Sequence, residues 1–454
     1  MDSLSFKKKF VHGLRWNSIE SIIYYSILAT HQIGLRAIST TNFYGAMGTL
    51  FALVFLTTAV FNFGFDFSII PFFSIYSSSK QLFRSYLLKQ IGVQIILYSF
   101  IASIMIFILA NNVLQIKKMP SISLFLAIII SSLIISEGIK KSLRIILQLG
   151  FKSHITATIE LFYIISYVSL VWGIYIFTGK ISLYTIFLPM LTISLIANSF
   201  LLTVIYKFYK KIPAVSSSNR QISWKEIGYN RITNYGYQLT RELFTSNFLI
   251  PFFAMNFGLA LAALLELVTA LNQFITIIIK KIFGITGQAL LSHVKNMHIS
   301  AKRKVFDMAS RNLYTVLIIV VSLIILTYKP IIALKAPQAS ADNTFLGLLF
   351  FILLFSENFI LLYEKWFIIE EKTLYLIIFN GSLLALFWGL LQVPYLNSPL
   401  IILSALIVLR LIACIWLMLA SFYAWQLRPP GLNKKFYIVY ISLALLISYF
   451  YLFL

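Results

Sequence analysis

The chain has 454 residues, of which 60% are hydrophobic, 16% aromatic and 11% charged, and its mean hydropathy is +0.89. Soluble domains average about a quarter charged residues, so this composition excludes a water-facing globule and indicates a polytopic membrane protein. The 37 Lys and Arg against 14 Asp and Glu give a net charge of +23. These cations stand in short clusters between apolar runs, which excludes a nucleic-acid-binding domain. A single cysteine, Cys414, excludes a disulfide framework and a thiolate metal cluster.

Apolar runs long enough to span the hydrocarbon core, about 20 residues as a helix, recur along the whole chain. The first six predicted helices lie near 14–38, 45–77, 87–115, 120–147, 153–178 and 182–206. After a polar stretch, seven more lie near 230–255, 258–280, 305–328, 343–369, 373–393, 398–424 and 436–454. The predicted domains are an N-terminal six-helix lobe, a cytoplasmic linker, a C-terminal six-helix lobe and an appended C-terminal helix, at 1–212, 213–229, 230–424 and 425–454.

The distribution of basic residues predicts the orientation. With the N-terminus in the cytoplasm, most of the 37 Lys and Arg fall in segments on the cytoplasmic side, as the positive-inside rule requires. The basic residues of 140–152 and the linker region 207–229 are counted on that side. Loops near 40–44 and 329–342 are then exterior. Arg241 and Arg410 are the two basic residues that this count assigns to neither side of the membrane.

Polar residues recur between the two halves of the chain. Asn42-Phe43 returns as Asn256-Phe257, 214 positions later. At the same offset, one polar face of the first helix is matched in the seventh, pairing Asn17, Glu20, Tyr24 and His31 with Arg231, Asn234, Gln238 and Thr245. The second and eighth helices pair Thr58, Asn62 and Asp66 with Asn272, Thr276 and Lys280. This pattern predicts duplicated lobes, a common plan in transporters.

The segments Ser39–Gly45 and Phe61–Asp66 carry a resemblance to a known family. Their sequences are Ser-Thr-Thr-Asn-Phe-Tyr-Gly, which leads into the second predicted helix, and Phe-Asn-Phe-Gly-Phe-Asp, which lies within that helix. This pattern resembles the start of polysaccharide (O-antigen type) flippases of the multidrug/oligosaccharidyl-lipid/polysaccharide exporter superfamily. The resemblance implies an all-α fold with two six-helix bundles in a V shape, here with an extra C-terminal helix and about 13 helices.

The same resemblance implies a function. Such a flippase moves a lipid-linked oligosaccharide across the bacterial cytoplasmic (inner) membrane by alternating access. Its partners are that substrate, membrane lipids and membrane proteins of polysaccharide assembly. The alternatives are a cation-coupled small-molecule or drug exporter of the same superfamily, and a membrane-embedded polysaccharide polymerase or glycosyltransferase. Because the sequence shows no paired acids, metal-ligand spacing or Gly-rich phosphate loop, we predict no enzyme activity, cofactor or metal.

Charged groups inside a membrane are costly and normally face a cavity or a partner. Arg241, near the middle of the predicted helix 230–255, is a candidate for binding the substrate's pyrophosphate, because a guanidinium offers a planar fork of donors. An ion pair with Glu20 or Asp66 is the alternative. Asp66 follows Gly64, so a bend is expected there. The predicted substrate-binding set, for which ligand-free interhelical bonding is the competing interpretation, is Arg241, Glu20, Tyr24, His31, Gln238, Asn62, Asp66 and Glu266.

Overall fold

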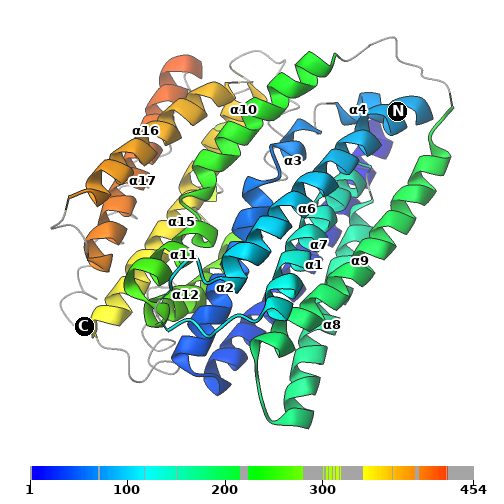
Figure 1. Ribbon diagram of the computed structural model, residues 1–454. Coiled ribbons are helices and arrows are strands. Elements are labelled where there is room, and N and C mark those ends of the chain that lie inside the picture. Colours follow the sequence, from blue (N-terminus) through cyan, green and yellow to red (C-terminus); the bar gives the residue numbers. More distant parts are fainter. Residues whose placement is uncertain are drawn as a thin grey trace. The chain divides into compact units, whose positions relative to one another are not determined.

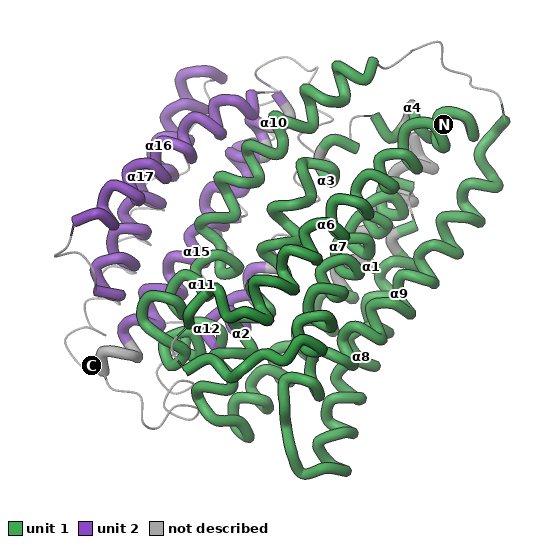
Figure 2. Tube along the Cα trace, in the orientation of Figure 1, with its two compact units in different colours: residues 1–266 green, residues 267–454 purple. Residues whose placement is uncertain are grey.

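Every regular element that the structure, a computed structural model, describes is a helix (Figure 1). The described residues are 3–69, 72–116, 118–150, 152–214, 223–279, 341–370, 372–393, 398–425, Leu427 and scattered positions between 300 and 317. The predicted C-terminal helix 436–454 and much of the predicted helix 305–328 lie outside them. The chain divides into two compact units, 1–266 and 267–454 (Figure 2).

The first unit is built from long helices. They are α1 (Ser3–Ile38), α2 (Thr41–Val60), α6 (Lys89–Ala110), α7 (Leu124–Leu149), α8 (Ser153–Thr178) and α9 (Leu183–Lys211). Side chains cap several of their starts, as where Ser182 and Thr185 form a reciprocal capping box at α9. The helices α7 and α9 pack against each other, as do α1 and α8.

The helix predicted over 45–77 is interrupted. It ends as α2 at Val60, and the short elements α3 (Phe65–Ser68), α4 (Phe73–Tyr76), α5 (Lys80–Leu82) and the π-helical η1 (Phe83–Leu88) follow. Phe63 and Gly64 have φ angles of 49° and 69°, in the left-handed region that an α-helix cannot continue through. The prediction of one continuous helix is therefore wrong beyond Val60, whereas the expected bend near Gly64 is confirmed.

The helix predicted over 230–255 is also divided. Its parts are α10 (Trp224–Glu242) and α11 (Ser246–Phe257), and α12 (Leu259–Ile279) follows. Thr245, the residue before α11, is extended, and its hydroxyl donates to the Glu242 carbonyl at 2.7 Å. Because α10 begins at Trp224, it includes the last part of the predicted linker. Both α10 and α11 pack on α2, and they belong to the first compact unit. The predicted lobe boundaries stay a prediction.

The second unit contains α15 (Ala341–Ile369), α16 (Thr373–Leu391) and α17 (Pro399–Trp425). Its core is aromatic. The rings of Phe379 and Trp416 stack with their centroids 4.1 Å apart, and Phe367 lies edge-on to Trp425 at 4.9 Å. These contacts join α15, α16 and α17 through large aromatic rings, of which Phe367 is buried and the other three are half-buried.

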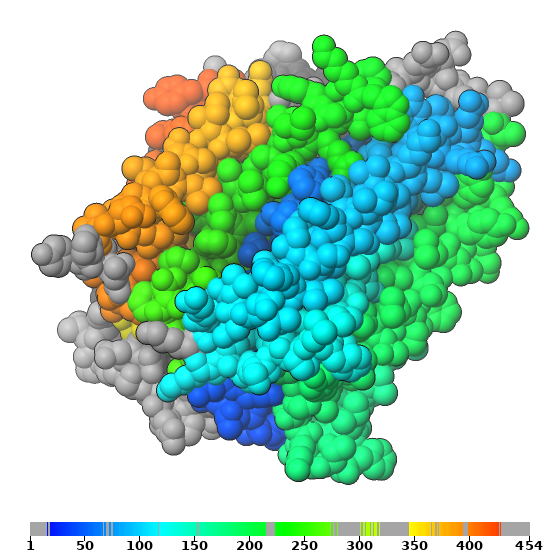
Figure 3. All heavy atoms as spheres, viewed as in Figure 1, coloured from blue at the N-terminus to red at the C-terminus, as the bar shows by residue number. Residues whose placement is uncertain are grey.

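Seven helices among the described residues are long and apolar enough to cross a membrane. They are Thr41–Val60, Lys80–Ala110, His154–Thr178, Leu183–Lys211, Phe345–Glu364, Thr373–Leu391 and Pro399–Trp425. In the space-filling view, α6 lies on the visible face (Figure 3), and its Ile96, Phe100 and Phe107 side chains are more than half exposed. Exposed apolar side chains of this size suit contact with lipid. The protein is a multi-pass membrane protein.

Candidate substrate site

One face of α7 carries four charged residues. Glu137, Lys140, Lys141 and Arg144 are spaced 0, 3, 4 and 7 along the helix, which places them on one side of it. The positive-inside count predicts a cytoplasmic position for the basic members of this group. The structure pairs each of them with a buried acid, and their side of the membrane stays a prediction.

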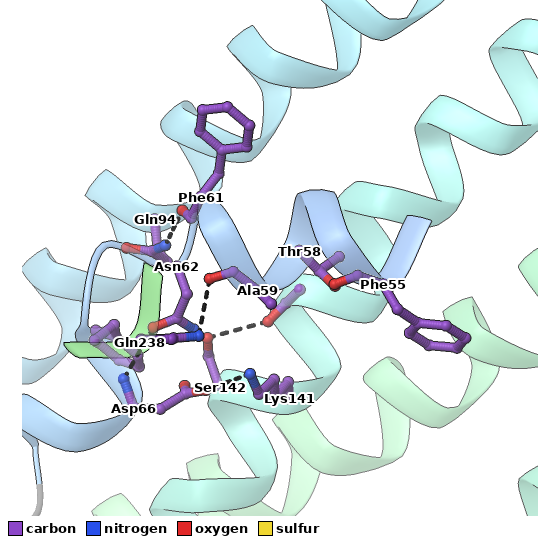
Figure 4. Close-up of polar contacts among 12 residues, drawn as sticks. Phe55, Thr58, Ala59, Phe61, Asn62, Asp66, Gln94, Lys141, Ser142 and Gln238 are labelled. Atoms are coloured by element: carbon purple, nitrogen blue, oxygen red, sulfur yellow. Dashed lines mark hydrogen bonds and ion pairs between the residues drawn. The ribbon is translucent and has the colours of Figure 1, made fainter. Parts of the chain in front are cut away.

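Lys141 and Asp66 form the ion pair at the centre of the candidate site (Figure 4). Lys141 Nζ lies 2.8 Å from Asp66 Oδ2, with the lysine side chain 44% exposed and the aspartate side chain 8% exposed. The second carboxylate oxygen, Oδ1, is buried and has no hydrogen-bond partner among the described residues. The pair therefore combines an accessible cation with a buried acceptor that no described residue satisfies.

Asn62 and Gln238 complete the polar cluster around this pair (Figure 4). The Asn62 Oδ1 accepts from the Asp66 backbone N–H at 3.1 Å, and its Nδ2 donates to the Tyr98 hydroxyl at 3.4 Å. Gln238 Nε2 donates to the Ala59 carbonyl at 2.9 Å. This carbonyl lies in the last turn of α2 and also accepts from the Asn62 backbone N–H at 3.4 Å. The Gln238 Oε1 is buried without a described partner. Together with Asp66 Oδ1, it gives the cluster two buried acceptors that no described residue satisfies.

Arg231 of α10 supports the backbone that carries these residues. Its Nε donates to the Phe63 carbonyl at 3.0 Å, and its Nη2 donates to the Gln94 Oε1. Gln94 in turn donates to the Phe61 carbonyl at 2.9 Å. In the sequence, Arg231 is the counterpart of Asn17 in the repeat and is counted among the cytoplasmic-side cations. Its contact with a turn 168 positions away depends on how α10 packs.

Glu20 lies in a different charged cluster. Its carboxylate is 2% exposed and lies 3.6 Å from Arg144 Nη2, while Arg144 Nη1 lies 3.5 Å from Glu160 on α8. One guanidinium thus serves two buried acids from two helices. This contact is an interhelical bond, as the ligand-free interpretation of Glu20 predicts. The sequence did not indicate its partner, Arg144 on α7. A role for Glu20 in substrate binding stays a prediction.

The remaining predicted residues lie on other elements. His31 is 1% exposed, and its Nδ1 accepts from the Trp172 indole at 3.1 Å. Tyr24 is half-buried on α1. Glu266 is half-buried on α12, against Gly48 of α2, where an added Cβ would lie 2.7 Å from the Glu266 Cγ. Arg241 is half-buried in the last turn of α10, directly before the break that precedes α11.

The structure therefore brings three predicted residues together, Asn62, Asp66 and Gln238, and adds Lys141 to them. A further polar cluster was missed entirely. Glu137 Oε1 accepts from Tyr163 at 3.1 Å and from Ser194 at 2.8 Å. The spacing of charges along α7 was visible in the sequence and could have indicated a buried polar face. Among the described residues, no group of three or more His, Cys, Asp or Glu is placed to hold a metal ion.

Comparison with known proteins identifies the fold. No protein-family model and no curated protein matches the chain. A multidrug resistance MATE family transporter of the MOP superfamily, in an inward-facing conformation, matches with a TM-score of 0.63 at 12% identity over 89% of this chain and 95% of the other. A MATE protein in complex with MaL6 matches with a TM-score of 0.63 at 12% identity, over 91% and 96% of the two chains. A MOP superfamily transporter from Pyrococcus furiosus, described as having a binding pocket of reversed polarity, matches with a TM-score of 0.52 at 12% identity, over 91% and 95%.

At this identity the likeness shows the fold alone. The chain has the all-helical fold of MATE transporters, and the predicted exporter-type fold class is confirmed.

Proposed function

We propose that this protein is an alternating-access transporter that moves a lipid-linked oligosaccharide from the cytoplasmic to the outer leaflet of a bacterial cytoplasmic membrane. The fold supports transport, since the solved structures it resembles are transporters. The observation that carries the choice of substrate is the Lys141–Asp66 pair, in which a partly exposed ammonium stands beside a buried carboxylate oxygen that has no described partner.

The chemistry of this cluster suits an anion that also carries hydroxyl groups. An ammonium has three N–H donors, and only one is needed for the contact with Asp66 at 2.8 Å, so two remain for a phosphate. The free Asp66 Oδ1 and Gln238 Oε1 require donors, because buried acceptors are normally satisfied. Sugar hydroxyls supply such donors. A lipid-linked oligosaccharide offers both groups in one molecule.

The lipid tail need not enter the polar cluster. Keeping it in the hydrocarbon of the bilayer avoids a cost of about 0.8 kcal/mol for each CH₂ exposed to water. Only the phosphate and sugars then require a polar path, which a cationic side chain makes less costly for an anion. Arg241 at the break between α10 and α11 is proposed as a second contact for the pyrophosphate.

A drug exporter is the second candidate, since matched structures include a multidrug resistance transporter. The buried Asp66 Oδ1 could receive the ammonium of an organic cation. However, the Lys141 ammonium lies 2.8 Å from the same carboxylate and would repel a second cation. Of the two charged groups the ammonium is the accessible one, with 44% of the Lys141 side chain exposed against 8% for Asp66, which supports an anionic substrate.

Reconstitution in vesicles separates the two candidates. Purified protein is placed in liposomes with a fluorescent polyprenyl-diphosphate oligosaccharide, and the fraction protected from an impermeant quencher is followed over time. We expect redistribution between leaflets with the parent, a loss of at least tenfold in rate with Lys141→Gln, and no change with Lys180→Gln, which alters an exposed loop lysine. Uptake of ethidium is measured in parallel. Ethidium transport without oligosaccharide redistribution would replace the flippase proposal with the exporter.

A further inference from the structure

The turn that joins α2 to α3 lies in close backbone contact with α10. Gly64 has a φ of 69°, and a Cβ at this position would lie 2.3 Å from the Arg231 carbonyl oxygen and 2.8 Å from the Tyr235 backbone nitrogen. Glycine is therefore required at this position for two reasons: the backbone is left-handed, and no space is left for a side chain. The turn therefore packs directly against the backbone of α10.

Three side chains on one face of α10 hold this turn and the end of α2. Arg231, Tyr235 and Gln238 are spaced 0, 4 and 7 along the helix and so project from one side. Arg231 donates to the Phe63 carbonyl at 3.0 Å, and Tyr235 packs its ring on Phe63 with centroids 5.0 Å apart. Gln238 donates to the Ala59 carbonyl at 2.9 Å. All three contacts are made with the backbone or side chains of residues 59–63.

Most residues of α10 are exposed or half-buried among the described residues. Only Ile227, Tyr237 and Gln238 of this helix are buried, and α10 is absent from the helices apolar enough to span a membrane among those described. Its end at Glu242 is separated from α11 by a non-helical step, which can act as a hinge because it has no continuous helical hydrogen bonds. The polar face described above is thus a main attachment of α10 to α2 and α3.

We propose that α10 is a clasp whose closure assembles the substrate site. This inference rests on the proposed function. Asp66 belongs to α3 and Gln238 to α10, so the two free acceptors stand in one cluster only while α10 holds the turn. Arg231 is then a positioning residue, acting through the Phe63 carbonyl and Gln94. Separation of α10 from the turn takes the site apart and releases the substrate.

A reversible cross-link tests the clasp. Phe63→Cys and Tyr235→Cys are introduced in a Cys414→Ser background, because these rings are in contact and Cys414 is the only native thiol. We expect the oxidised protein to transport at least tenfold more slowly than the reduced protein. We also expect hydrogen–deuterium exchange of the 59–66 amides to slow at least tenfold on oxidation, and this readout needs no substrate.

A matched control uses a pair outside the clasp. Ser136→Cys with Ser194→Cys joins α7 to α9, where the two hydroxyl oxygens are 2.8 Å apart, and its oxidation should leave both readouts unchanged. A second variant, Arg231→Ala, removes the hydrogen bond to the Phe63 carbonyl and should favour separation of α10 from the turn. We expect exchange of the 59–66 amides to be at least threefold faster than in the parent.

The outcomes separate the clasp from the substrate assignment. Equal exchange in the fully oxidised and reduced proteins, or exchange in Arg231→Ala no faster than in the parent, overturns the clasp whatever the substrate. Slower exchange on oxidation with no oligosaccharide transport even by the parent supports the clasp and overturns the proposed function. Slower exchange with transport unaffected overturns the link between the clasp and the site.

Discussion

Lys141 and Asp66 join α7 to the short helix α3 through a contact of 2.8 Å between Nζ and Oδ2. The two residues are 75 positions apart in the sequence, and Asp66 stands directly after the left-handed turn at Phe63 and Gly64. This ion pair consequently ties the charged face of α7 to the break after α2. It is the contact on which the proposed substrate site depends.

Removing the lysine should cost both stability and transport. In Lys141→Met the buried Asp66 carboxylate loses its counter-ion, which we expect to destabilise the fold by about 2 kcal/mol, less than for a fully buried pair because Lys141 is partly exposed. The double variant Lys141→Met, Asp66→Asn should recover the thermal unfolding temperature in detergent but not the transport. Recovery of transport by the double variant would contradict a role for the ammonium in binding the substrate.

Arg144 should be essential for the packing of α1, α7 and α8. Arg144→Gln leaves the carboxylates of Glu20 and Glu160 buried without the cation they share, at an expected cost of about 3 kcal/mol. Thermal unfolding measures this loss, and Lys180→Gln serves as the exposed control. Adding Glu160→Gln should restore part of the lost stability. If Arg144→Gln unfolds at the temperature of the parent, the ion pairs do not support the fold.

Gly64→Ala should destabilise the protein much more than Gly92→Ala. Alanine in the left-handed region costs about 1–2 kcal/mol, and its Cβ would also meet the Arg231 carbonyl at 2.3 Å. At Gly92, within α6, no atom lies within 4 Å of an added Cβ, so Gly92→Ala should be neutral or stabilising by up to about 1 kcal/mol. Comparable unfolding temperatures for the two variants would show that the turn does not need its left-handed form.

Arg241 is predicted to contact the pyrophosphate, with a graded response to substitution. Arg241→Lys keeps the positive charge without the planar fork of donors, and we expect partial transport. Arg241→Ala should abolish transport of the lipid-linked oligosaccharide in the vesicle assay. The amount of folded protein is checked by size-exclusion elution for both variants. Full transport by correctly folded Arg241→Ala would place the anion site elsewhere.

The predicted orientation can be read from the two ends of α9. Lys180, just before this helix, is predicted to be exterior, and Lys211, its last residue, cytoplasmic; both are exposed. In a Cys414→Ser background, Lys180→Cys in intact cells should react with an impermeant maleimide, and Lys211→Cys should react only after permeabilisation. The reverse pattern of labelling would invert the whole topology.

The sequence by itself determined that this is a helical membrane protein. Apolar runs of membrane-spanning length can be recognised without knowing any tertiary contact, because a helix in lipid satisfies its own backbone hydrogen bonds. The bend near Gly64 was likewise predicted from local composition, and so was the choice of Asn62, Asp66 and Gln238 as polar residues that require a partner or a cavity. These properties depend on residues close together in the chain.

Only the tertiary structure decided which charged groups meet. Lys141 pairs with Asp66 of α3, and Arg144 with Glu20 of α1 and Glu160 of α8, whereas a count of basic residues assigned these cations to the cytoplasmic side. Such a count registers the sign of a charge and its place in the chain, but not the partner that packing brings to it. Ion pairs between distant segments are set by how helices pack, because their energy depends on separation and burial, and neither quantity is encoded locally.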